Sequence, residues 1–401
     1  MAAATILEQV GRRVRLGLVG GGIDSVIGAT HLLALRADGL ADVVAGALSI
    51  DPQVGAASAR ALLLDPARGY PTWQAMLAAE RDRADGIDAV VVITPPQSHA
   101  EIASAFLDAG IHVLCEKPMT STAEEADRLV ATVASRAALF AVTHCYTGYP
   151  MVRQARAMIR SGAIGAVRLV EGQFASGEPG VLREPADPAQ RHWRFRRSSM
   201  GPASVLGEVG THAHNIVEYV TGQRVVEVSA HLSTIAEGRE VYDNAYLTVE
   251  FDGGAVGRLW SSFVAAGNEH GLEFKVFGTD GSLHWRQEEP EHLWLLRPGE
   301  AATRITRGLD SNDADSLSAT RIRPGHPEGY LMAFAAIYRD FLTGVLRAVA
   351  GQDEQPEMRH LPSVHDGLST MRLIDAALAS HERGGLPVKV TSGPSIGGTD
   401  V

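Results

Sequence analysis

The sequence predicts an α/β domain with a doubly wound parallel sheet, followed by an α+β domain with a large, open, mostly antiparallel sheet. Two observations carry this prediction. In the first third of the chain, short apolar runs alternate with helical patterns, which is typical of parallel strands joined by right-handed crossovers. Between about residues 165 and 300 the runs become longer, and Asp-Gly turns separate them in pairs.

The predicted N-terminal domain covers residues 1–147. In the segment 101–110, Ile102 and Phe106 share one helical face, and Gly110 ends the helix. Helices of this kind separate five apolar runs that are short enough for strands buried on both faces. The strands are expected at 14–20, 43–49, 87–94, 111–117 and 139–146.

The predicted C-terminal domain covers residues 148–390. Asp-Gly turns divide its longer apolar runs into two hairpins, within 244–264 and 272–285. Helical patterns return at 329–350 and 363–384. Residues 391–401 are polar and rich in glycine and serine, so we expect a flexible tail.

The overall composition excludes several classes of protein. The formal net charge of −11 argues against nucleic acid or an anionic membrane as the main partner. No apolar run is long enough to span a bilayer, and the N-terminus lacks the pattern of a signal peptide. The chain has only two cysteines, without metal-type spacing, which fits a reducing cytoplasm.

A glycine-rich segment, GLVGGGIDSVIGATH at 17–31, follows the first predicted strand and opens a helix. Gly20, Gly21, Gly22 and Ile23 would let backbone N–H groups approach a pyrophosphate at the helix N-terminus. The next glycine, Gly28, comes about three residues too late for the usual G-x-G-x-x-G spacing. A plain glycine turn therefore remains the alternative to a dinucleotide site.

An acid beyond the second predicted strand favours NAD over NADP. Ser49 stands where contact with the adenosine ribose is expected, and Asp51 lies two residues further on. A carboxylate there accepts hydrogen bonds from ribose hydroxyls and repels a 2′-phosphate. We therefore predict NAD as the cofactor, with NADP less favoured.

Two further strand ends are predicted to face the cofactor, because open α/β sheets bind ligands at the carboxyl ends of their strands. Thr94, Pro95 and Pro96 form a rigid turn before a helix that begins near Ser98 and contains His99. Thr94, Pro95, Pro96 and His99 are predicted cofactor neighbours, although a turn that only ends the strand is the alternative.

Glu116, Lys117 and Pro118 follow the fourth predicted strand. Lys117 precedes a proline, so its backbone should be extended, and the pattern Ser121-x-x-Glu124 predicts a capping box for the next helix. A lysine beside a dinucleotide can present its ammonium group to a substrate hydroxyl and favour its deprotonation. A salt-bridged structural lysine is the alternative.

These motifs occur in the order found in the glucose–fructose oxidoreductase / inositol dehydrogenase / rhizopine-catabolism (Gfo/Idh/MocA) family. The chain resembles that family over about residues 13–385, with "TPPQSHAEIA", "GIHVLCEKP" and "GEVGTHAHNIVEY" following the glycine turn. The resemblance implies an N-terminal Rossmann domain, a C-terminal α+β domain and nicotinamide-dependent chemistry on sugars or cyclitols. It also implies that Lys117 is catalytic, binds substrate and belongs to the cofactor site, and that Glu116 lies near the nicotinamide ribose.

A second constellation lies at 204–222, where a glycine-containing turn enters an amphipathic helix. Family members typically show Asp-x-Gly-x-His here, and this chain has Glu208 and His212 in those positions. His212 suits a general base because imidazole titrates near neutral pH, and Glu208 would orient it or hold a substrate hydroxyl. Asn215 can bind a sugar hydroxyl but cannot act as a base. No metal is predicted, because His212 and His214 point in different directions on a helix.

Several weaker candidates complete the predicted substrate site. His144, Tyr146 and Tyr149 follow a sheet strand and would border the pocket. The arginine-rich segment 191–197 could recognise a carboxylate or phosphate, or form a solvated or subunit-contact loop. The substrate-site residues predicted from these segments and from the turn at 324–330 are His144, Tyr146, Tyr149, Trp193, Arg194 and His326.

The sequence thus predicts an NAD-dependent dehydrogenase that oxidises a secondary hydroxyl of a sugar, glycoside, anhydrosugar or cyclitol. The resemblance is nearest to the branch acting on pyranosides and anhydrosugars, where oxidation at C3 is common. The alternatives are an NAD-retaining glycosidase that acts by oxidation and elimination, and a non-catalytic dinucleotide-binding redox sensor. The open sheet needs a cover for its exposed face, which predicts a homodimer or homotetramer.

Overall fold

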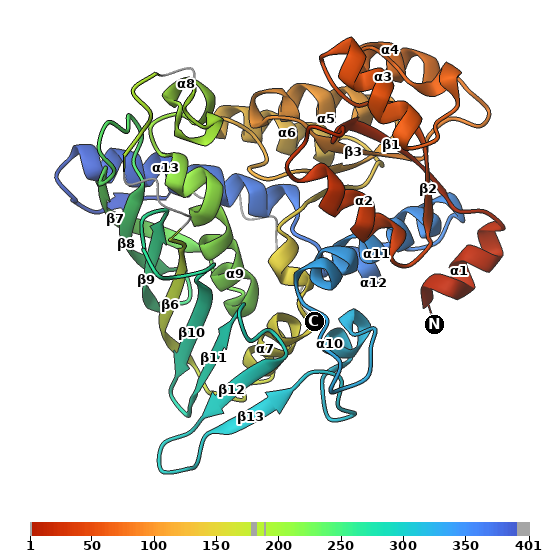
Figure 1. Ribbon diagram of the computed structural model, residues 1–401. Coiled ribbons are helices and arrows are strands. Elements are labelled where there is room, and N and C mark those ends of the chain that lie inside the picture. The colour runs from red at the N-terminus through yellow and green to blue at the C-terminus, as the bar shows by residue number, and fades with distance from the viewer. Residues whose placement is uncertain (1, 178–182, 188–189, 391–401) are drawn as a thin grey trace. The chain divides into compact units, whose positions relative to one another are not determined.

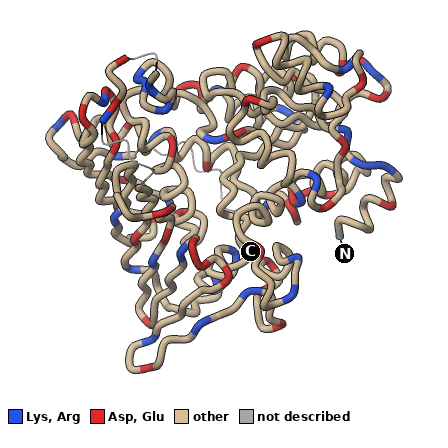
Figure 2. Tube along the Cα trace, viewed as in Figure 1, with Lys and Arg blue, Asp and Glu red and all other residues tan. Residues whose placement is uncertain are grey.

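The computed structural model describes residues 2–177, 183–187 and 190–390. By its internal contacts the chain divides into two compact units, residues 1–149 with 328–368, and residues 150–327 with 369–401. Acidic and basic residues are interspersed along both units (Figure 2). In the described ranges, no helix combines the length and apolar character that a membrane span requires.

The first unit is built on a five-stranded parallel sheet in the order β2-β1-β3-β4-β5 (Figure 1). Its strands are completely apolar at their centres, as in β3, where all five residues are buried, because helices cover both faces. This confirms the predicted parallel sheet. The strands are β1 (Val14–Gly20), β2 (Ala41–Ala47), β3 (Ala89–Ile93), β4 (His112–Cys115) and β5 (Phe140–Val142).

The helices of this unit follow the strands in alternation and include a segment that returns from late in the chain. They are α1 (Ala2–Val10), α2 (Gly28–Arg36), α3 (Pro52–Ala61), α4 (Trp73–Glu80), α5 (His99–Asp108), α6 (Ala123–Ala134), α11 (Tyr330–Val349) and α12 (Gln355–Met358). Helix α11 packs against α1, α2 and the turn Cys145–Gly148 through buried aromatic rings such as Phe334 and Tyr338. The predicted first domain ends at residue 147 and does not contain this returning segment. Sequence patterns do not reveal it, because α11 packs on residues that lie more than 180 positions earlier in the chain, as Tyr330 does on Cys145.

The second unit contains a nine-stranded sheet in the order β13-β12-β11-β10-β6-β9-β8-β7-β14. Among the described residues, its strand pairs are antiparallel except β6 with β9, which confirms the predicted mostly antiparallel sheet. The strands are β6 (Val167–Ala175), β7 (Val225–Ser233), β8 (Asn244–Phe251), β9 (Val256–Ser262), β10 (Leu272–Gly278), β11 (Ser282–Arg286), β12 (His292–Leu296), β13 (Thr303–Thr306) and β14 (Val388–Lys389).

Both predicted hairpins form where the Asp-Gly turns stand, between β8 and β9 and between β10 and β11. Helix α9 packs on one face of the sheet against β6, β9 and β10, and α7 packs on α9 (Figure 1). Gly172 permits this approach, because a Cβ there would lie 2.7 Å from a methyl group of Val217 in α9. The helices are α7 (Pro150–Arg160), α8 (Arg197–Met200), α9 (Thr211–Thr221) and α10 (Ala314–Ala319), and α13 (Val364–Glu382) runs across the division between the units.

Candidate active site

The glycine turn between β1 and α2 leaves no room for side chains. Gly20 and Gly21 have φ of 79° and 73°, a conformation that favours glycine. A Cβ on Gly20 would lie 2.5 Å from the Ile93 carbonyl oxygen, and one on Gly22 would lie 2.7 Å from the Leu48 carbonyl oxygen. The backbone of this turn is therefore bare at the carboxyl ends of the strands, which suits close approach of a pyrophosphate.

Gly28 corresponds structurally to the third glycine of a dinucleotide-binding turn, although its spacing in the sequence is too long. It is the first residue of α2, and a Cβ there would lie 2.5 Å from the Gly21 carbonyl oxygen. The third glycine of dinucleotide-binding turns permits this kind of close packing between helix and strand. The signal in the sequence is a glycine at the start of the helix rather than a glycine at a fixed spacing.

The ribose-side candidates lie past the end of β2. The Asp51 carboxylate caps α3 by accepting hydrogen bonds from the backbone N–H groups of Gln53, at 2.7 Å, and Val54, at 3.2 Å. The hydroxyl of Ser49 accepts a hydrogen bond from the N–H of Asp51. Ile23, in the glycine turn, is 65% exposed. A negative charge thus sits beside a helix N-terminus, and the residues present fit a dinucleotide.

The turn after β3 exposes Pro95 and buries Pro96, and α5 begins at His99 as expected. The imidazole of His99 is wholly buried. Its Nε2 lies 2.7 Å from the carbonyl oxygen of Thr94, and its Nδ1 lies 2.9 Å from the carbonyl oxygen of Pro118. His99 therefore joins the turn after β3 to the turn after β4.

Glu116 is the centre of a buried polar network. Its Oε1 lies 3.1 Å from His31 Nε2 and accepts a hydrogen bond from the Thr143 hydroxyl, and its Oε2 accepts one from the Lys117 N–H at 3.0 Å. Burial raises the pKa of Glu116, but the contacts with His31, Lys117 and Thr143 together lower it to about 2. His31 Nδ1 in turn lies 2.6 Å from the hydroxyl of Tyr338. The acid is a carboxylate held inside the unit.

Lys117 is half-buried at the carboxyl end of β4, and its peptide bond to Pro118 is cis. The predicted capping box is wrong by one position. Thr122 caps α6 by accepting from the N–H of Glu125, and the Glu125 carboxylate accepts from the N–H of Ser121. The pattern Thr-x-x-Glu satisfies the same rule one residue later, so the sequence offered two overlapping boxes.

The segment after β5 places its aromatic residues in the interior of the first unit. The rings of Tyr146 and Tyr149 stack at 6.4 Å, and Tyr146 also contacts Tyr330 of α11. His144, two residues before Tyr146, is also buried. Burial raises the pKa of the neighbouring Cys145 to about 12, so this cysteine is a neutral thiol.

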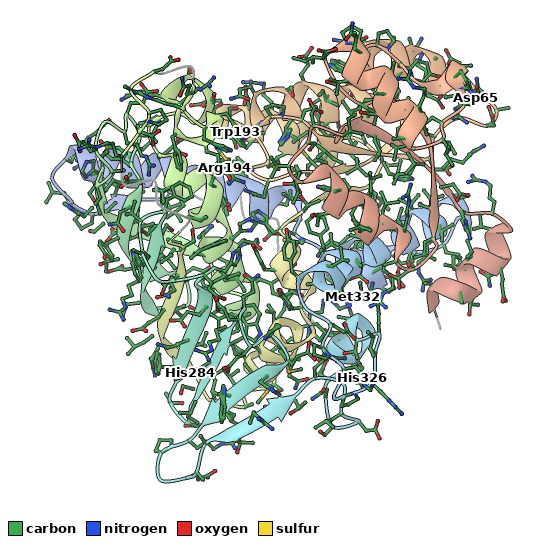
Figure 3. All side chains as sticks on the ribbon, viewed as in Figure 1. Asp65, Trp193, Arg194, His284, His326 and Met332 are labelled. Atoms are coloured by element: carbon green, nitrogen blue, oxygen red, sulfur yellow. The ribbon has the colours of Figure 1, made fainter. Side chains whose placement is uncertain are left out.

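In the second unit, Glu208 lies in a π-helical turn, Leu206–Gly210, that leads into α9. Such turns often occur at functional sites. The Glu208 Oε2 lies 3.0 Å from Nε of Arg194, so two predicted substrate residues form an ion pair. Trp193 and Arg194 are adjacent in the segment before α8 (Figure 3).

His212 follows in the first turn of α9 and is 6% exposed. The centroid of its ring lies 5.9 Å from that of Phe174 in β6, and the centroids of Phe174 and His270 lie 4.3 Å apart. His270 is a candidate that the sequence did not indicate, because only the sheet brings the loop before β10 to this point. Asn215 is buried one turn further along α9.

His214 faces a different cluster. Its Nδ1 lies 3.1 Å from Thr370 Oγ1 and its Nε2 lies 3.0 Å from Glu218 Oε1. Within the described ranges, no three His, Cys, Asp or Glu side chains gather as metal ligands would. His326 lies on an exposed turn (Figure 3) whose backbone is held by Arg307, which donates to the His326 carbonyl oxygen at 2.7 Å.

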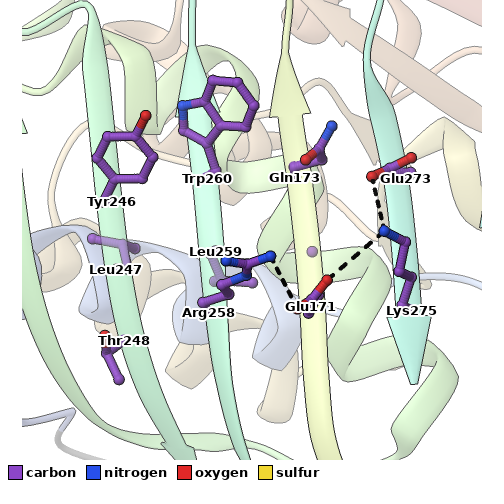
Figure 4. Close-up of a pocket in the computed structure, with 11 residues that line it drawn as sticks. Glu171, Gln173, Tyr246, Leu247, Thr248, Arg258, Leu259, Trp260, Glu273 and Lys275 are labelled. Carbon is purple, nitrogen blue, oxygen red and sulfur yellow. Dashed lines mark ion pairs between the residues drawn. The ribbon is translucent and has the colours of Figure 1, made fainter. Parts of the chain in front are cut away.

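A pocket of about 420 Å³ lies on the second unit's sheet (Figure 4). The rings of Tyr246 and Trp260 stack at 5.8 Å on its floor. Beside them, Glu171 pairs with Arg258 at 3.0 Å and with Lys275 at 3.9 Å. These side chains alternate with the buried ones that face α9, as Glu171 does with Gly172, so the pocket is on the opposite face of the sheet from α9 and His212.

Comparison with known proteins decides the family. Residues 14–144 match the Gfo/Idh/MocA oxidoreductase family with its NAD-binding Rossmann fold, and residues 152–284 match the Gfo/Idh/MocA C-terminal domain. The uncharacterized oxidoreductase YfiI of Bacillus subtilis is 30% identical over 385 residues, which are 95% of this chain and 98% of that protein. The chain belongs to the Gfo/Idh/MocA family. The predicted resemblance and fold class are thereby confirmed.

Other family members with named activities are also similar. Levoglucosan dehydrogenase of Pseudarthrobacter phenanthrenivorans is 27% identical over 348 residues, covering 79% of this chain and 82% of that protein. A crystal structure of an inositol dehydrogenase homologue from Azotobacter vinelandii, in complex with NAD⁺, aligns with a TM-score of 0.88 and 36% identity, over 94% of this chain and 97% of that one. This chain is thus a member of an oxidoreductase family that includes sugar and cyclitol dehydrogenases.

Proposed function

We propose that the protein oxidises a secondary hydroxyl of a sugar, glycoside, anhydrosugar or cyclitol with NAD as the acceptor. The observation that carries this proposal is the match over nearly the whole chain to an inositol dehydrogenase homologue in complex with NAD⁺, in a chain that keeps Lys117 at a Rossmann strand end and His212 in α9. Other relatives act on levoglucosan and on scyllo-inositol by their names.

The dinucleotide would be held by the glycine turn at Gly20–Gly22, with Asp51 on the ribose side and the turn at 94–96 beside the nicotinamide. When bound, its nicotinamide ring accepts a hydride from the substrate carbon. Asp51 would repel a 2′-phosphate, since its carboxylate already lies at the N-terminus of α3. We therefore propose a preference for NAD over NADP, which the ratio of kcat/KM for the two cofactors tests directly.

His212 would remove the proton from the reacting hydroxyl, because imidazole is the side-chain type that ordinarily exchanges a proton near neutral pH. Lys117 would place its ammonium group on the same oxygen and stabilise the negative charge that develops there. Glu208, paired with Arg194, would hold a neighbouring hydroxyl rather than take a proton. Their joint action rests on the family resemblance.

The first experiment is a substrate panel. Purified protein with NAD is mixed with glucosides, anhydrosugars and inositols, and NADH is followed at its absorbance near 340 nm. A rise with any of these supports the proposal, and the position of the new ketone shows whether C3 of a pyranoside reacts. Glycoside cleavage without NADH would favour a glycosidase that retains its nicotinamide. Binding of NAD without turnover of any compound would favour a sensor.

The variant Lys117→Ala separates catalysis from binding. We expect kcat to fall while NAD affinity is kept, since the ammonium group acts on the substrate oxygen. A variant that keeps full turnover would overturn the assigned role.

We also propose that a second copy of the chain covers the sheet face shown in Figure 4. Tyr246 is 52% exposed there, and paired acids and bases beside it give the face complementary charges for a copy of itself. Light scattering should give the mass of a dimer or tetramer, and Tyr246→Arg should weaken the association of the subunits. Leu33→Arg, at an exposed site in the first unit, is the matched control. A stable wild-type monomer would exclude this interface.

A further inference from the structure

His99 is a buried polar side chain that the proposed chemistry does not use directly. In the protein without ligands the residue is fully enclosed by protein atoms. Yet both ring nitrogens are within 3 Å of a carbonyl oxygen, and the two carbonyls belong to the two turns that border the proposed site, at Thr94 and at Pro118. The residue before Pro118 is Lys117.

The two contacts hold parts of the chain that the sheet alone does not fix. Strands β3 and β4 pair up to Val92 and Cys115, and the backbone N–H of Glu116 still donates to the carbonyl oxygen of Val92. Beyond that point the strands end, and the imidazole ring contacts the carbonyl oxygens of both turns, at Thr94 and Pro118. His99 is the first residue of α5, and its ring is fully buried in the packing at this end of the helix.

The protonation of His99 is set by groups inside the same unit. A neutral imidazole carries one N–H and donates to one carbonyl, whereas the protonated ring donates to both. Burial lowers the pKa of His99 and Lys117 also lowers it, while the two carbonyls and Glu116 raise it. The two short contacts fit the protonated ring, which donates at both nitrogens, whereas a neutral ring donates to one carbonyl and leaves its other nitrogen against the second carbonyl oxygen without a hydrogen bond.

We propose that His99 is a positioning residue that clamps the turn at 94–96 to the turn at 116–118 and so fixes Lys117 relative to the cofactor-binding turn. This inference rests on the proposed function for its catalytic consequence, but the clamp itself is a property of the protein without ligand. A displacement of about 1 Å in a reacting group can cost about 100-fold in rate, so a loose turn would be costly.

Two amide variants each keep one of the two hydrogen bonds and remove the other. The Asn side-chain nitrogen reaches the position of His Nδ1, so His99→Asn can still donate to Pro118. The Gln side-chain nitrogen reaches the position of Nε2, so His99→Gln can still donate to Thr94. His99→Leu removes both bonds. His112→Asn is the matched control, because His112 is at the opposite end of β4 and accepts from the Leu139 N–H.

The first measurement needs no ligand or activity. Hydrogen exchange of the unliganded protein, read by mass spectrometry, should rise at 116–120 in His99→Gln and at 94–98 in His99→Asn. It should rise at both segments in His99→Leu and at neither in His112→Asn. Equal exchange in the Asn and Gln variants at both segments would overturn the clamp, and comparison at matched thermal stability separates this result from general unfolding.

The second measurement follows the consequence for function. His99→Asn should keep kcat but bind NAD more weakly in calorimetry, and His99→Gln should lose about 10-fold or more in kcat while keeping NAD affinity. Native kcat and NAD affinity in His99→Leu would overturn the positioning role. If the wild-type protein oxidises none of the tested polyols, the proposed function fails, and the exchange and NAD-binding results still decide the clamp.

Discussion

Replacing Glu116 by glutamine tests the buried network beside Lys117. The change keeps the size of the side chain and removes its charge. In the wild-type protein the carboxylate contacts His31 Nε2 at 3.1 Å and the Lys117 N–H at 3.0 Å, and it accepts from the hydroxyl of Thr143. An amide cannot accept at both of its polar atoms, so at least one of these partners loses its acceptor.

The expected size follows from the pKa of Glu116. Burial raises this pKa, but the contacts with His31, Lys117 and Thr143 bring it from 4.5 to about 2. A shift of that size corresponds to about 3 kcal/mol of stability. Because the folded-state pKa is the lower one, this stabilisation is fully present above about pH 4.5 and is lost as the pH falls towards 2.

The assay is urea unfolding of the wild type and Glu116→Gln at several pH values between 3 and 7. The variant should be less stable by about 3 kcal/mol at pH 7, and the difference should shrink as the pH falls below about 4.5. A difference that is the same at pH 3 and pH 7 would refute the assigned ionisation.

Glu218→Gln is the matched control in the other unit. Burial raises the pKa of Glu218, but His214 and Arg224 lower it to about 2, as for Glu116. Its loss of stability should follow the same pH window. Only Glu116→Gln should also change kcat, because only Glu116 binds the backbone of Lys117. Equal effects of both variants on kcat would contradict this reasoning.

Three further predictions test other parts of the molecule. His212→Asn should lower kcat by about 100-fold or more and leave NAD affinity unchanged, by stopped-flow and calorimetry. Gly28→Ala should weaken NAD binding and destabilise the protein by about 1–3 kcal/mol, because its Cβ would overlap a backbone oxygen; Gly55→Ala in α3, whose Cβ has 3.5 Å of room, should be neutral or stabilising. Tyr338→Phe should cost about 1–2 kcal/mol in unfolding free energy, since it removes the hydroxyl that pairs with His31.

The sequence predicted those features of the fold that neighbouring residues determine. The hairpins between β8 and β9 and between β10 and β11 form at the Asp-Gly turns. In the first turn Gly254 has a positive φ, and in the second a Cβ on Gly281 would lie 2.7 Å from the Leu296 carbonyl oxygen. The five parallel strands were likewise visible as short apolar runs. Their burial on both faces makes their centres apolar, as in β3, where all five residues are buried.

Features that depend on distant partners could not be predicted. The place of α11 is decided by contacts with α1 and α2 at the other end of the chain, and amphipathic periodicity says only that some face is buried. Gly28 was missed for a related reason. A spacing rule assumes one loop length, whereas the physical requirement is the approach of a helix to the Gly21 carbonyl oxygen, which a longer loop also satisfies.

The two charges after β4 show how local and distant information combine at this site. Glu116 has its oxygens engaged by His31, Thr143 and the backbone of Lys117, so a cofactor contact by this acid, which stays a prediction, would have to share those oxygens. The acid at this strand end is therefore explained by its hydrogen bond to the backbone N–H of Lys117, which helps to hold that residue in place. If so, changes at His31 or Tyr338, which lie in the interior, should alter Lys117 through a continuous chain of hydrogen bonds. Catalysis by Lys117 would then depend on helices α2 and α11 as much as on its own strand.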